Sequence, residues 1–254
     1  MANLSKLLIL FAVALLAACS GGPDNSEHGN PAPTLIDTPS RPQHILVIGG
    51  TSGIGLQTAE LAAQRGHHVT ALARRPERMP LRHPRLQTVG GNILNKENMA
   101  NAVRDKDAVV IAIGMGPTRD EVTLFSEGTA NVLSAMQDGG VDRLIAITGI
   151  GAGDSRGHGG FFYENLLFPL ALKTIYTDKD RMETLIQSST ERGIVWTIVR
   201  PGFLTDEPAN HRYRVINDLQ DVTAGDITRA DVAHFIIAAI ESGDYIGVSP
   251  LISE

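Results

Sequence analysis

A glycine-rich turn between an apolar strand and a helix constrains the fold of this chain more than any other feature. The turn, Gly49-Gly50-Thr51-Ser52-Gly53-Ile54-Gly55, follows the β-branched run 45–48. Glycines allow a tight turn and a close approach of the backbone to a pyrophosphate, and the following helix supplies free N–H groups and partial positive charge. The turn therefore predicts a dinucleotide-binding site whose phosphate contacts come from Gly49, Thr51, Ser52, Gly53, Ile54 and Gly55.

Segments of strand length alternate with segments of helix length along the rest of the chain. Strands are predicted at 45–48, 69–73, 86–89, 108–113, 144–148 and 195–199, and helices at 56–65, 96–104, 121–137 and 177–191, with a last helix after Thr228. Such alternation is typical of a parallel sheet covered by helices on both faces, which binds ligands beyond the carboxyl ends of its strands. We therefore expect an α/β fold with one doubly wound parallel sheet, in a single domain over residues 43–254.

The residues after the second strand discriminate between the two nicotinamide cofactors. An NAD site usually places an acidic side chain there, about 20 residues past the glycines, to bind the ribose hydroxyls. This chain has Arg74-Arg75-Pro76 at that position. A carboxylate would repel a 2′-phosphate, whereas a guanidinium binds it with paired hydrogen bonds. Arg74 and Arg75 therefore favour NADP over NAD, although two solvated surface arginines would look the same in sequence.

The first 42 residues differ in character from the rest. Lys6 precedes the apolar run 7–18, which is too short to cross a bilayer and is typical of a secretory signal. The run ends at Cys19, and Leu16-Ala17-Ala18-Cys19 resembles a bacterial lipoprotein signal in which this cysteine is acylated and becomes the new N-terminus. Residues 19–42 are rich in glycine, proline and serine and predict a flexible tether.

These features predict a signal peptide over 1–18 and membrane attachment only through the lipid at Cys19. The expected location is the cell envelope, on the periplasmic face of the outer membrane, or the cytoplasm if the signal is not used. The net charge of −6 argues against nucleic acid as a partner. A single cysteine excludes a disulfide framework and a thiolate metal site, and we expect no metal. The chain is expected to act on a small molecule as a monomer or homodimer.

Several segments together resemble the atypical branch of the short-chain dehydrogenase/reductase superfamily, which has a Rossmann fold and includes NmrA-like regulators and biliverdin-reductase-B-like and flavin-reductase-like enzymes. Besides the glycine turn, the resemblance rests on 91–93, 112–114, 196–202 and 227–233. It implies that Asn92 and Ile93 bracket adenine, that Ala112, Ile113 and Gly114 pass under the ribose, and that Pro201 and Phe203 close over nicotinamide.

The same resemblance implies a catalytic group that this chain carries in altered form. The superfamily uses Tyr-x-x-x-Lys, in which lysine lowers the tyrosine pKa, together with a serine after the fifth strand. Lys179 aligns with that lysine, Tyr176 precedes it by three positions rather than four, and Thr148 stands near the serine. One residue of slip rotates a side chain by about 100° around a helix. Tyr176 is therefore either an acid of unusual geometry or an aromatic on the helix face.

Two readings of the function follow. The first is an NADPH-dependent oxidoreductase that transfers hydride to a small aromatic, flavin or quinone-like acceptor, as flavin-reductase-like members do without a protein acid. The second is an NmrA-like sensor that binds NADP without turnover, which the altered Tyr176 and Lys179 spacing favours. A loop histidine, His158, lies where a substrate loop would cross the cofactor, and 161–163 would dock that loop or wall an apolar substrate pocket.

Overall fold

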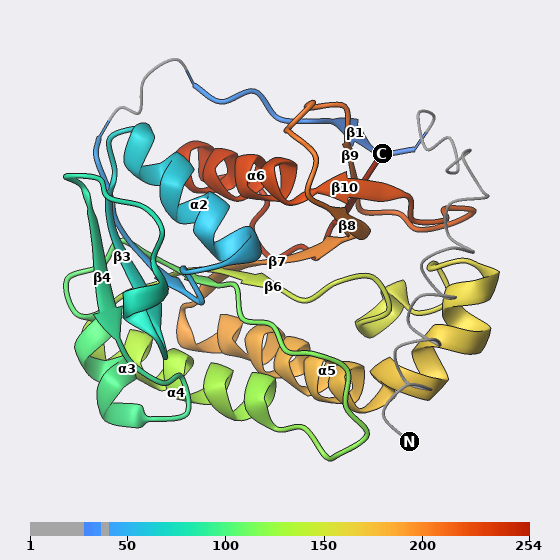
Figure 1. Cartoon of the computed structure of the whole chain (residues 1–254), viewed down its shortest axis with the longest axis horizontal. Coiled ribbons are helices and arrows are strands. Elements are labelled where there is room, and N and C mark those ends of the chain that lie inside the picture. Colours follow the sequence, from blue (N-terminus) through green and yellow to red (C-terminus); the bar gives the residue numbers. More distant parts are fainter. Residues whose placement is uncertain (1–27, 37–40) are drawn as a thin grey trace.

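The computed structural model describes residues 28–36 and 41–254, and its strands form one large sheet and one small one (Figure 1). The strands are β1 (Asn30–Pro31), β2 (His44–Ile48), β3 (His68–Ala73), β4 (Leu86–Gly90), β5 (Ala108–Ile111), β6 (Arg143–Ile147), β7 (Val195–Pro201), β8 (Phe203–Thr205), β9 (Arg214–Ile216), β10 (Asp226–Thr228) and β11 (Leu251–Ser253). Nine of them follow the order β1-β9-β11-β7-β6-β5-β2-β3-β4, while β8 and β10 form a separate parallel pair.

Six neighbouring strands of the large sheet are parallel, and all six were predicted from the sequence. In their order across the sheet they are β4, β3, β2, β5, β6 and β7. β3 and β5 lie on opposite sides of β2, so the direction of winding reverses between β2 and β5. Ile48 at the end of β2 pairs with Leu72 and with Ile111. The predicted strand 108–113 is two residues too long, because β5 ends at Ile111. Ala112 and Ile113 therefore leave the sheet at the reversal point, where doubly wound sheets bind their ligands.

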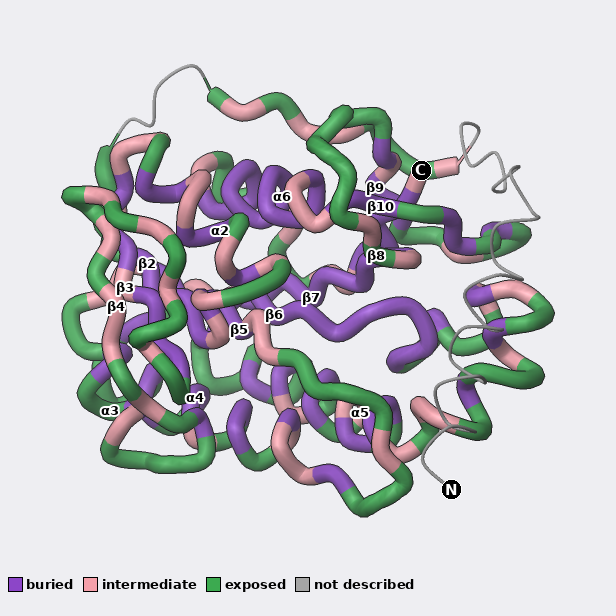
Figure 2. Tube along the Cα trace, viewed as in Figure 1, coloured by how far each residue is buried: buried purple, intermediate pink, exposed green. Residues whose placement is uncertain are grey.

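Helices cover both faces of this sheet, as expected. One face carries α3 (Lys96–Val103), α4 (Leu124–Gly139) and α5 (Lys173–Ser188), and the other carries α2 (Gly53–Gln64) and α6 (Arg229–Ser242) (Figure 1). Strand β2 shows the reason. Leu46 packs in the core under α3, α4 and α5, whereas Ile45 and Val47 pack in the core under α2 and α6. Successive side chains of a strand point to opposite faces, so a continuous apolar run needs cover on both. Figure 2 shows the buried residues along the central strands and α6.

The edge of the sheet beyond β7 was not predicted. β11 pairs with β7 in parallel, β9 pairs with β11 in antiparallel, and β1 pairs with β9 through Asn30 and Pro31. Ala32 and Leu35 pack against the core, and Arg65 Nη2 donates to the Ile36 carbonyl oxygen at 2.5 Å. The described part of the segment expected as a tether over 19–42 thus lies against the domain, and the packed domain begins before residue 43.

A helical segment before α5 was also missed. The π-helix η3 (Tyr163–Leu172) leads directly into α5, which begins at Lys173 rather than at residue 177. Three short 3₁₀ helices complete the described elements: η1 (Pro76–Arg78), η2 (Gly153–Ser155) and η4 (Ser189–Arg192). Within 28–36 and 41–254, no helix combines the length and the apolar character needed to cross a membrane. The predicted signal over 1–18 and Cys19 lie outside the described residues.

Candidate functional site

A cavity of about 200 Å³ opens at the carboxyl ends of β2, β3 and β5, at the point where the winding of the sheet reverses. Most of the residues predicted to bind a dinucleotide line it together: Gly49, Thr51, Ser52, Arg74, Arg75, Asn92, Ile93, Ala112, Ile113 and Gly114. The lining also includes Gly91, which belongs to the predicted element 91–93, and residues that sequence reasoning missed, namely Ile48, Leu72, Ala73, Arg78 and Leu124. The tertiary structure thus brings five separate parts of the chain to one cavity: 48–52, 72–78, 91–93, 112–114 and Leu124.

The glycine turn has the backbone geometry that a close phosphate contact requires. Gly49 has φ +89°, and a Cβ atom added there would lie 2.5 Å from the Ala112 carbonyl oxygen. A Cβ atom added at Gly55 would lie 2.3 Å from the Gly49 carbonyl oxygen. Ser52 precedes α2 in an extended conformation and makes no side-chain capping bond. The first N–H groups of α2 are therefore free to bind an anion.

Three arginines stand at the wall of this cavity. Arg74 and Arg75 directly follow β3, and Arg78 lies one helical turn later on η1, which begins at Pro76. All three side chains are exposed, and none forms an ion pair or side-chain hydrogen bond with a residue in 28–36 or 41–254. A proline fixes φ for the first position of a helix. The sequence Arg75-Pro76 could therefore have indicated a helical turn that carries Arg78 back toward Arg75.

The residues predicted to bracket adenine, Asn92 and Ile93, lie in a tight loop that lines the cavity. Asn92 Oδ1 accepts a hydrogen bond from Leu94 N at 3.1 Å, and Asn92 N donates to Asn98 Oδ1 at 2.9 Å. The Asn92 oxygen thus holds the loop itself, and only its amide nitrogen is left to address a ligand. Ile93 is buried against α4, where its side chain occupies the space beside Gly128.

Tyr176, Lys179 and Thr148 meet at the turn after β6, away from the cavity lining. A Cβ atom added at Gly149 would lie 3.0 Å from the Tyr176 hydroxyl and 3.7 Å from Lys179 Nζ. Lys179 Nζ donates to the Thr148 carbonyl oxygen and lies 4.7 Å from the centroid of the Tyr176 ring. Residues three apart on a helix are neighbours on its surface. The altered spacing therefore still brings both side chains to the turn. Ile175 stands four positions before Lys179, where the resemblance would place the tyrosine, and it is buried in the core.

Burial shifts the pKa values of both groups. It lowers the pKa of the Lys179 amine from 10.5 to about 8, against the opposing effect of the Glu183 carboxylate. It raises the pKa of the Tyr176 hydroxyl above its usual value, despite a hydrogen bond with Tyr163. The phenol of Tyr176 therefore keeps its proton at neutral pH and cannot serve as a base, whereas Lys179 exchanges its proton near pH 8.

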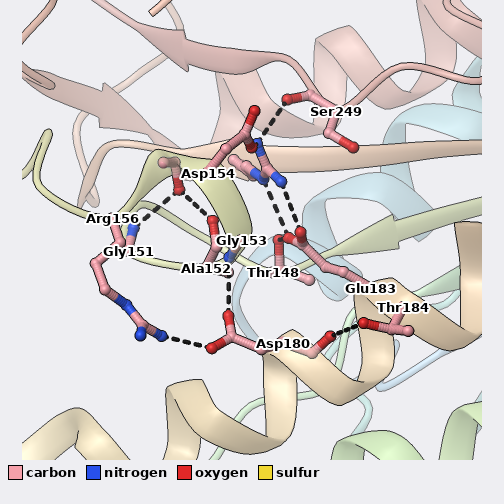
Figure 3. Close-up of polar contacts among 12 residues, drawn as sticks. Thr148, Gly151, Ala152, Gly153, Asp154, Arg156, Asp180, Glu183, Thr184 and Ser249 are labelled. Atoms are coloured by element: carbon pink, nitrogen blue, oxygen red, sulfur yellow. Dashed lines mark hydrogen bonds and ion pairs between the residues drawn. The ribbon is translucent and has the colours of Figure 1, made fainter.

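The hydroxyl of Thr148 is engaged in a buried ionic network. Thr148 Oγ1 donates to Glu183 Oε1 at 2.7 Å, and Arg200 Nη2 donates to Glu183 Oε2 at 2.6 Å (Figure 3). Asp154 forms a further ion pair with Arg200. Burial opposes the charge on Arg200, but the Glu183 and Asp154 carboxylates raise the pKa of its guanidinium. Thr148 is thus a structural link between β6 and α5 and does not present a hydroxyl as the family's serine does.

Pro201 and Phe203 lie beside this turn rather than in the cavity. Ile150 N donates to the Pro201 carbonyl oxygen at 3.0 Å, and the Phe203 ring packs 5.4 Å from that of Tyr163, measured between centroids. His158 Nδ1 lies 2.9 Å from the Val222 carbonyl oxygen, which ties its imidazole to the neighbouring loop. The Tyr163 hydroxyl donates to the Ile150 carbonyl oxygen at 2.9 Å. Of the aromatic run 161–163, Tyr163 therefore docks the loop, as expected.

The two groups of residues are linked through the start of α4. Leu124 lines the cavity, and the ring centroid of the next residue, Phe125, lies 5.4 Å from Lys179 Nζ. A residue of α6 also approaches the glycine turn, since a Cβ atom added at Gly53 would lie 3.8 Å from Arg229 Nε. Arg229 Nη1 forms an ion pair with Asp206 at 2.8 Å. Arg229 therefore places a further cation close to the glycine turn.

The described part of the chain contains no group of three or more histidine, cysteine, aspartate or glutamate residues that could hold a metal ion. The cavity walls instead offer N–H groups, guanidinium groups and glycine backbone. These are donors suited to phosphate oxygens, so the residues present fit a dinucleotide.

Comparison with known proteins agrees with this geometry. The model of a family described as NAD(P)H-binding matches residues 49–243. The chain is 27% identical over 203 residues to an uncharacterized sugar epimerase of Bacillus subtilis (strain 168). The aligned region covers 78% of this chain and 87% of that protein.

Two solved structures show the same fold. A short-chain dehydrogenase/reductase from Veillonella parvula in complex with NADP aligns with a TM-score of 0.70 and 18% identity, over 84% of this chain and 94% of the other. An anaerobilin reductase from Escherichia coli O157:H7 aligns with a TM-score of 0.65 and 23% identity, over 83% of this chain and 97% of the other. The expected α/β fold and the predicted resemblance are thus confirmed.

Proposed function

Because this chain belongs to the NAD(P)H-binding family, we propose that it is an NADPH-dependent oxidoreductase of the atypical short-chain dehydrogenase/reductase type. The acceptor is a small aromatic, flavin or quinone-like molecule. The observation that carries the choice of NADPH is the set of three guanidinium groups at one wall of the cavity, from Arg74, Arg75 and Arg78, which have no partner among residues 28–36 and 41–254. A 2′-phosphate would satisfy them, whereas the hydroxyl of NADH would leave them solvated.

The chain's own residues divide the work of binding. The free N–H groups at the start of α2 and the backbone from Gly49 to Gly55 would hold the pyrophosphate. Asn92 and Ile93 would flank the adenine, and Ala112 to Gly114 would support the ribose at the end of β5. When bound, the nicotinamide supplies the hydride.

Proton handling by the protein is limited to two groups at the turn after β6. Lys179 Nζ holds its proton below about pH 8 and can hydrogen-bond a ribose or substrate oxygen if it exchanges its bond to the Thr148 carbonyl oxygen. The Tyr176 hydroxyl, with its raised pKa, can donate a hydrogen bond but cannot release its proton at neutral pH. This pairing suits acceptors that need no strong protein acid or base, such as flavins and quinones.

A turnover assay tests this proposal. NADPH oxidation is followed with a panel of quinones, flavins and linear tetrapyrroles, the last because one protein of the same fold is an anaerobilin reductase. We expect turnover with at least one apolar aromatic acceptor and a lower rate with NADH than with NADPH. The matched variant Arg74→Glu/Arg75→Glu should lose the preference for NADPH while keeping turnover with NADH.

An NADP-binding sensor of the NmrA-like kind is the second candidate. It is favoured by bonds that already occupy the polar groups expected to act in catalysis, since the Thr148 hydroxyl binds Glu183 and the Lys179 amine binds the Thr148 carbonyl oxygen. Tight binding of NADPH with no oxidation on any member of the panel would support the sensor and contradict the reductase.

We further propose that the chain is lipidated at Cys19 and exported to the cell envelope. The support is the apolar run 7–18 that ends in small residues at the chain's single cysteine. NADPH is scarce outside the cytoplasm, so an exported protein would have to retain its cofactor. Labelling with a radioactive fatty acid should mark the chain and not its Cys19→Ala variant, and the nucleotide that co-purifies with the envelope form would show what is retained.

A further inference from the structure

An exposed apolar patch covers the outer side of the segment that leads into α5. Its five residues and their exposed fractions are Phe161 (76%), Phe162 (63%), Leu166 (58%), Leu167 (47%) and Leu170 (54%). They lie in one run of ten residues that spans most of η3 and the two residues before it. Monomeric soluble proteins rarely expose so many large apolar side chains side by side, so a contiguous patch of this kind marks an interaction surface.

The inner side of the same segment is apolar as well, and this distinguishes it from an ordinary surface helix. Tyr163 and Phe168 are buried and pack against each other with ring centroids 6.0 Å apart. The one polar residue among the exposed positions 165–170 is Asn165, whose amide donates to the Phe161 carbonyl oxygen at 2.8 Å. A helix that is apolar all round needs cover on every side. Among the described residues, the domain covers the inner side at Tyr163, Phe168 and Leu172, while the five residues of the apolar patch stay exposed.

Two exposed cations, Arg119 and Lys173, stand at the border of the apolar patch, and the exposed acids Asp120 and Glu121 follow Arg119 in the chain. Arg119 Nε donates to the Leu170 carbonyl oxygen at 3.4 Å, and Lys173 follows the segment directly as the first residue of α5. Both are exposed, and neither forms an ion pair with a residue in 28–36 or 41–254. The acid within the segment itself, Glu164, turns inward, since its carboxylate accepts from Gly157 N and Gly159 N, each at 3.1 Å. An apolar face bordered by cations is typical of a segment that lies in the interface of an anionic bilayer.

The start of the described chain lies toward this same part of the molecule. His28 and Gly29 line a surface hollow with residues 217–221. The chain after residue 221 contacts the loop that precedes the apolar patch. Ala224 N donates to the carbonyl oxygen of His158 in that loop at 2.8 Å. Cys19 stands nine positions before His28. Nine residues span at most about 30 Å, so a lipid on Cys19 could not hold this part of the molecule far from a membrane.

We propose that the apolar patch docks on the surface of a lipid bilayer with anionic headgroups. Phe161, Phe162, Leu166, Leu167 and Leu170 enter the boundary between headgroups and acyl chains, and Arg119 and Lys173 contact the phosphates. The protein thus holds the membrane at two points, the N-terminal segment and the patch. This docking would fix the orientation of the domain, and it does not depend on which cofactor the cavity binds.

Depth measurement at a single nitroxide tests the proposal. The chain has one cysteine, so the full-length Cys19→Ala variant has none, and Asn165→Cys gives one labelling site that leaves the apolar patch intact. On phosphatidylethanolamine/phosphatidylglycerol vesicles we expect the label to lie about 5–10 Å below the headgroups, with a severalfold lower accessibility to a water-soluble nickel chelate than in solution. The matched control is Gln57→Cys on α2, an exposed position on another side of the molecule (Figure 1), whose label should stay accessible.

Charge substitutions distinguish membrane binding by the apolar patch from membrane binding by the N-terminal segment. In the Asn165→Cys background, Leu166→Glu/Leu170→Glu should return the label to water with a severalfold rise in nickel accessibility, even where the chain stays on the vesicles through residues 7–18. Gln57→Glu/Gln64→Glu adds the same charge on α2 and should leave the label shielded. NADPH affinity, measured on the same samples, should not change, which separates this proposal from the proposed enzymatic function.

Three results would overturn the proposal. The label could remain aqueous on vesicles in the otherwise unmodified patch. It could be equally shielded on pure phosphatidylcholine vesicles, which would remove the role of Arg119 and Lys173. The label could also be shielded from the nickel chelate in the absence of vesicles. If its spectrum then shows dipolar broadening, two labels lie close together and a second copy of this chain covers the patch.

Discussion

Removal of the arginines at the cavity wall should weaken the binding of NADPH by an amount that can be calculated, and leave the binding of NADH nearly unchanged. A hydrogen bond to a charged group contributes about 1.5–3 kcal/mol net. Arg74 and Arg75 are exposed, so water and salt screen them and the lower end applies. We therefore expect Arg74→Ala/Arg75→Ala to cost about 2–3 kcal/mol of NADPH binding, which raises its Kd roughly 30- to 150-fold. NADH lacks the 2′-phosphate, and its Kd should change by less than about threefold.

The fold should survive this double substitution, because neither side chain bonds to any residue in 28–36 or 41–254. Surface substitutions of this kind change the free energy of unfolding by about 0.5 kcal/mol or less. Arg78→Ala should raise the Kd for NADPH about tenfold. Arg82→Ala is the matched control, since Arg82 is exposed, carries the same charge and does not line the cavity.

Titration of each variant with NADPH and with NADH by isothermal calorimetry, at low and high salt, measures these effects. The difference between the two cofactors should shrink as salt rises, because exposed charges are screened. Equal affinities of the unmodified protein for NADPH and NADH would refute the reasoning, as would an Arg82→Ala variant that loses as much affinity as Arg74→Ala/Arg75→Ala.

The remaining predictions concern packing and buried charge. Gly55→Ala should abolish cofactor binding and lower the free energy of unfolding by about 1–3 kcal/mol, because its methyl would lie 2.3 Å from a carbonyl oxygen of the turn; Gly114→Ala, which meets nothing within 4 Å, should leave unfolding unchanged. Glu183→Ala should cost about 3–5 kcal/mol in urea unfolding, because it strips the buried Arg200 of its main partner. Burial lowers the pKa of Lys179 from 10.5 to about 8, so its ammonium destabilises the fold below about pH 8. That cost is relieved as pH rises toward 10.5, and the stability of the protein relative to Lys179→Met should increase over this window. A pH-independent difference would contradict the shift.

Much of the cofactor cavity was predictable because its determinants are local. The glycines of 49–55 act through their own backbone, and Arg74 and Arg75 follow from the end of one strand. The six parallel strands were found because continuous apolar runs such as β2 need cover on both faces. The contacts of Asn92 with Leu94 and Asn98 are local as well, since the three residues lie within seven positions of one another in the loop before α3 and its first turn.

The catalytic group was harder to judge because its state depends on partners far along the chain. Spacing alone left Tyr176 either as an acid or as a surface aromatic, and burial against Tyr163 shows a phenol that keeps its proton. Nothing near Thr148 in sequence indicates that Glu183, 35 positions later, binds its hydroxyl. Arg229 likewise reaches the glycine turn from the far end of the chain.

By itself the sequence determined the class of fold and the kind of ligand, since the strand, turn and helix that bind a dinucleotide are contiguous and their periodicity is local. Tertiary structure alone decided which polar groups remain free. Within the described part of the chain, it left Arg78 unpaired beside Arg74 and Arg75 and one side of η3 exposed, and it tied Thr148 to Glu183. The physical reason is that hydrogen bonding and burial are pairwise properties, and most of the deciding pairs here join residues that are distant in the chain.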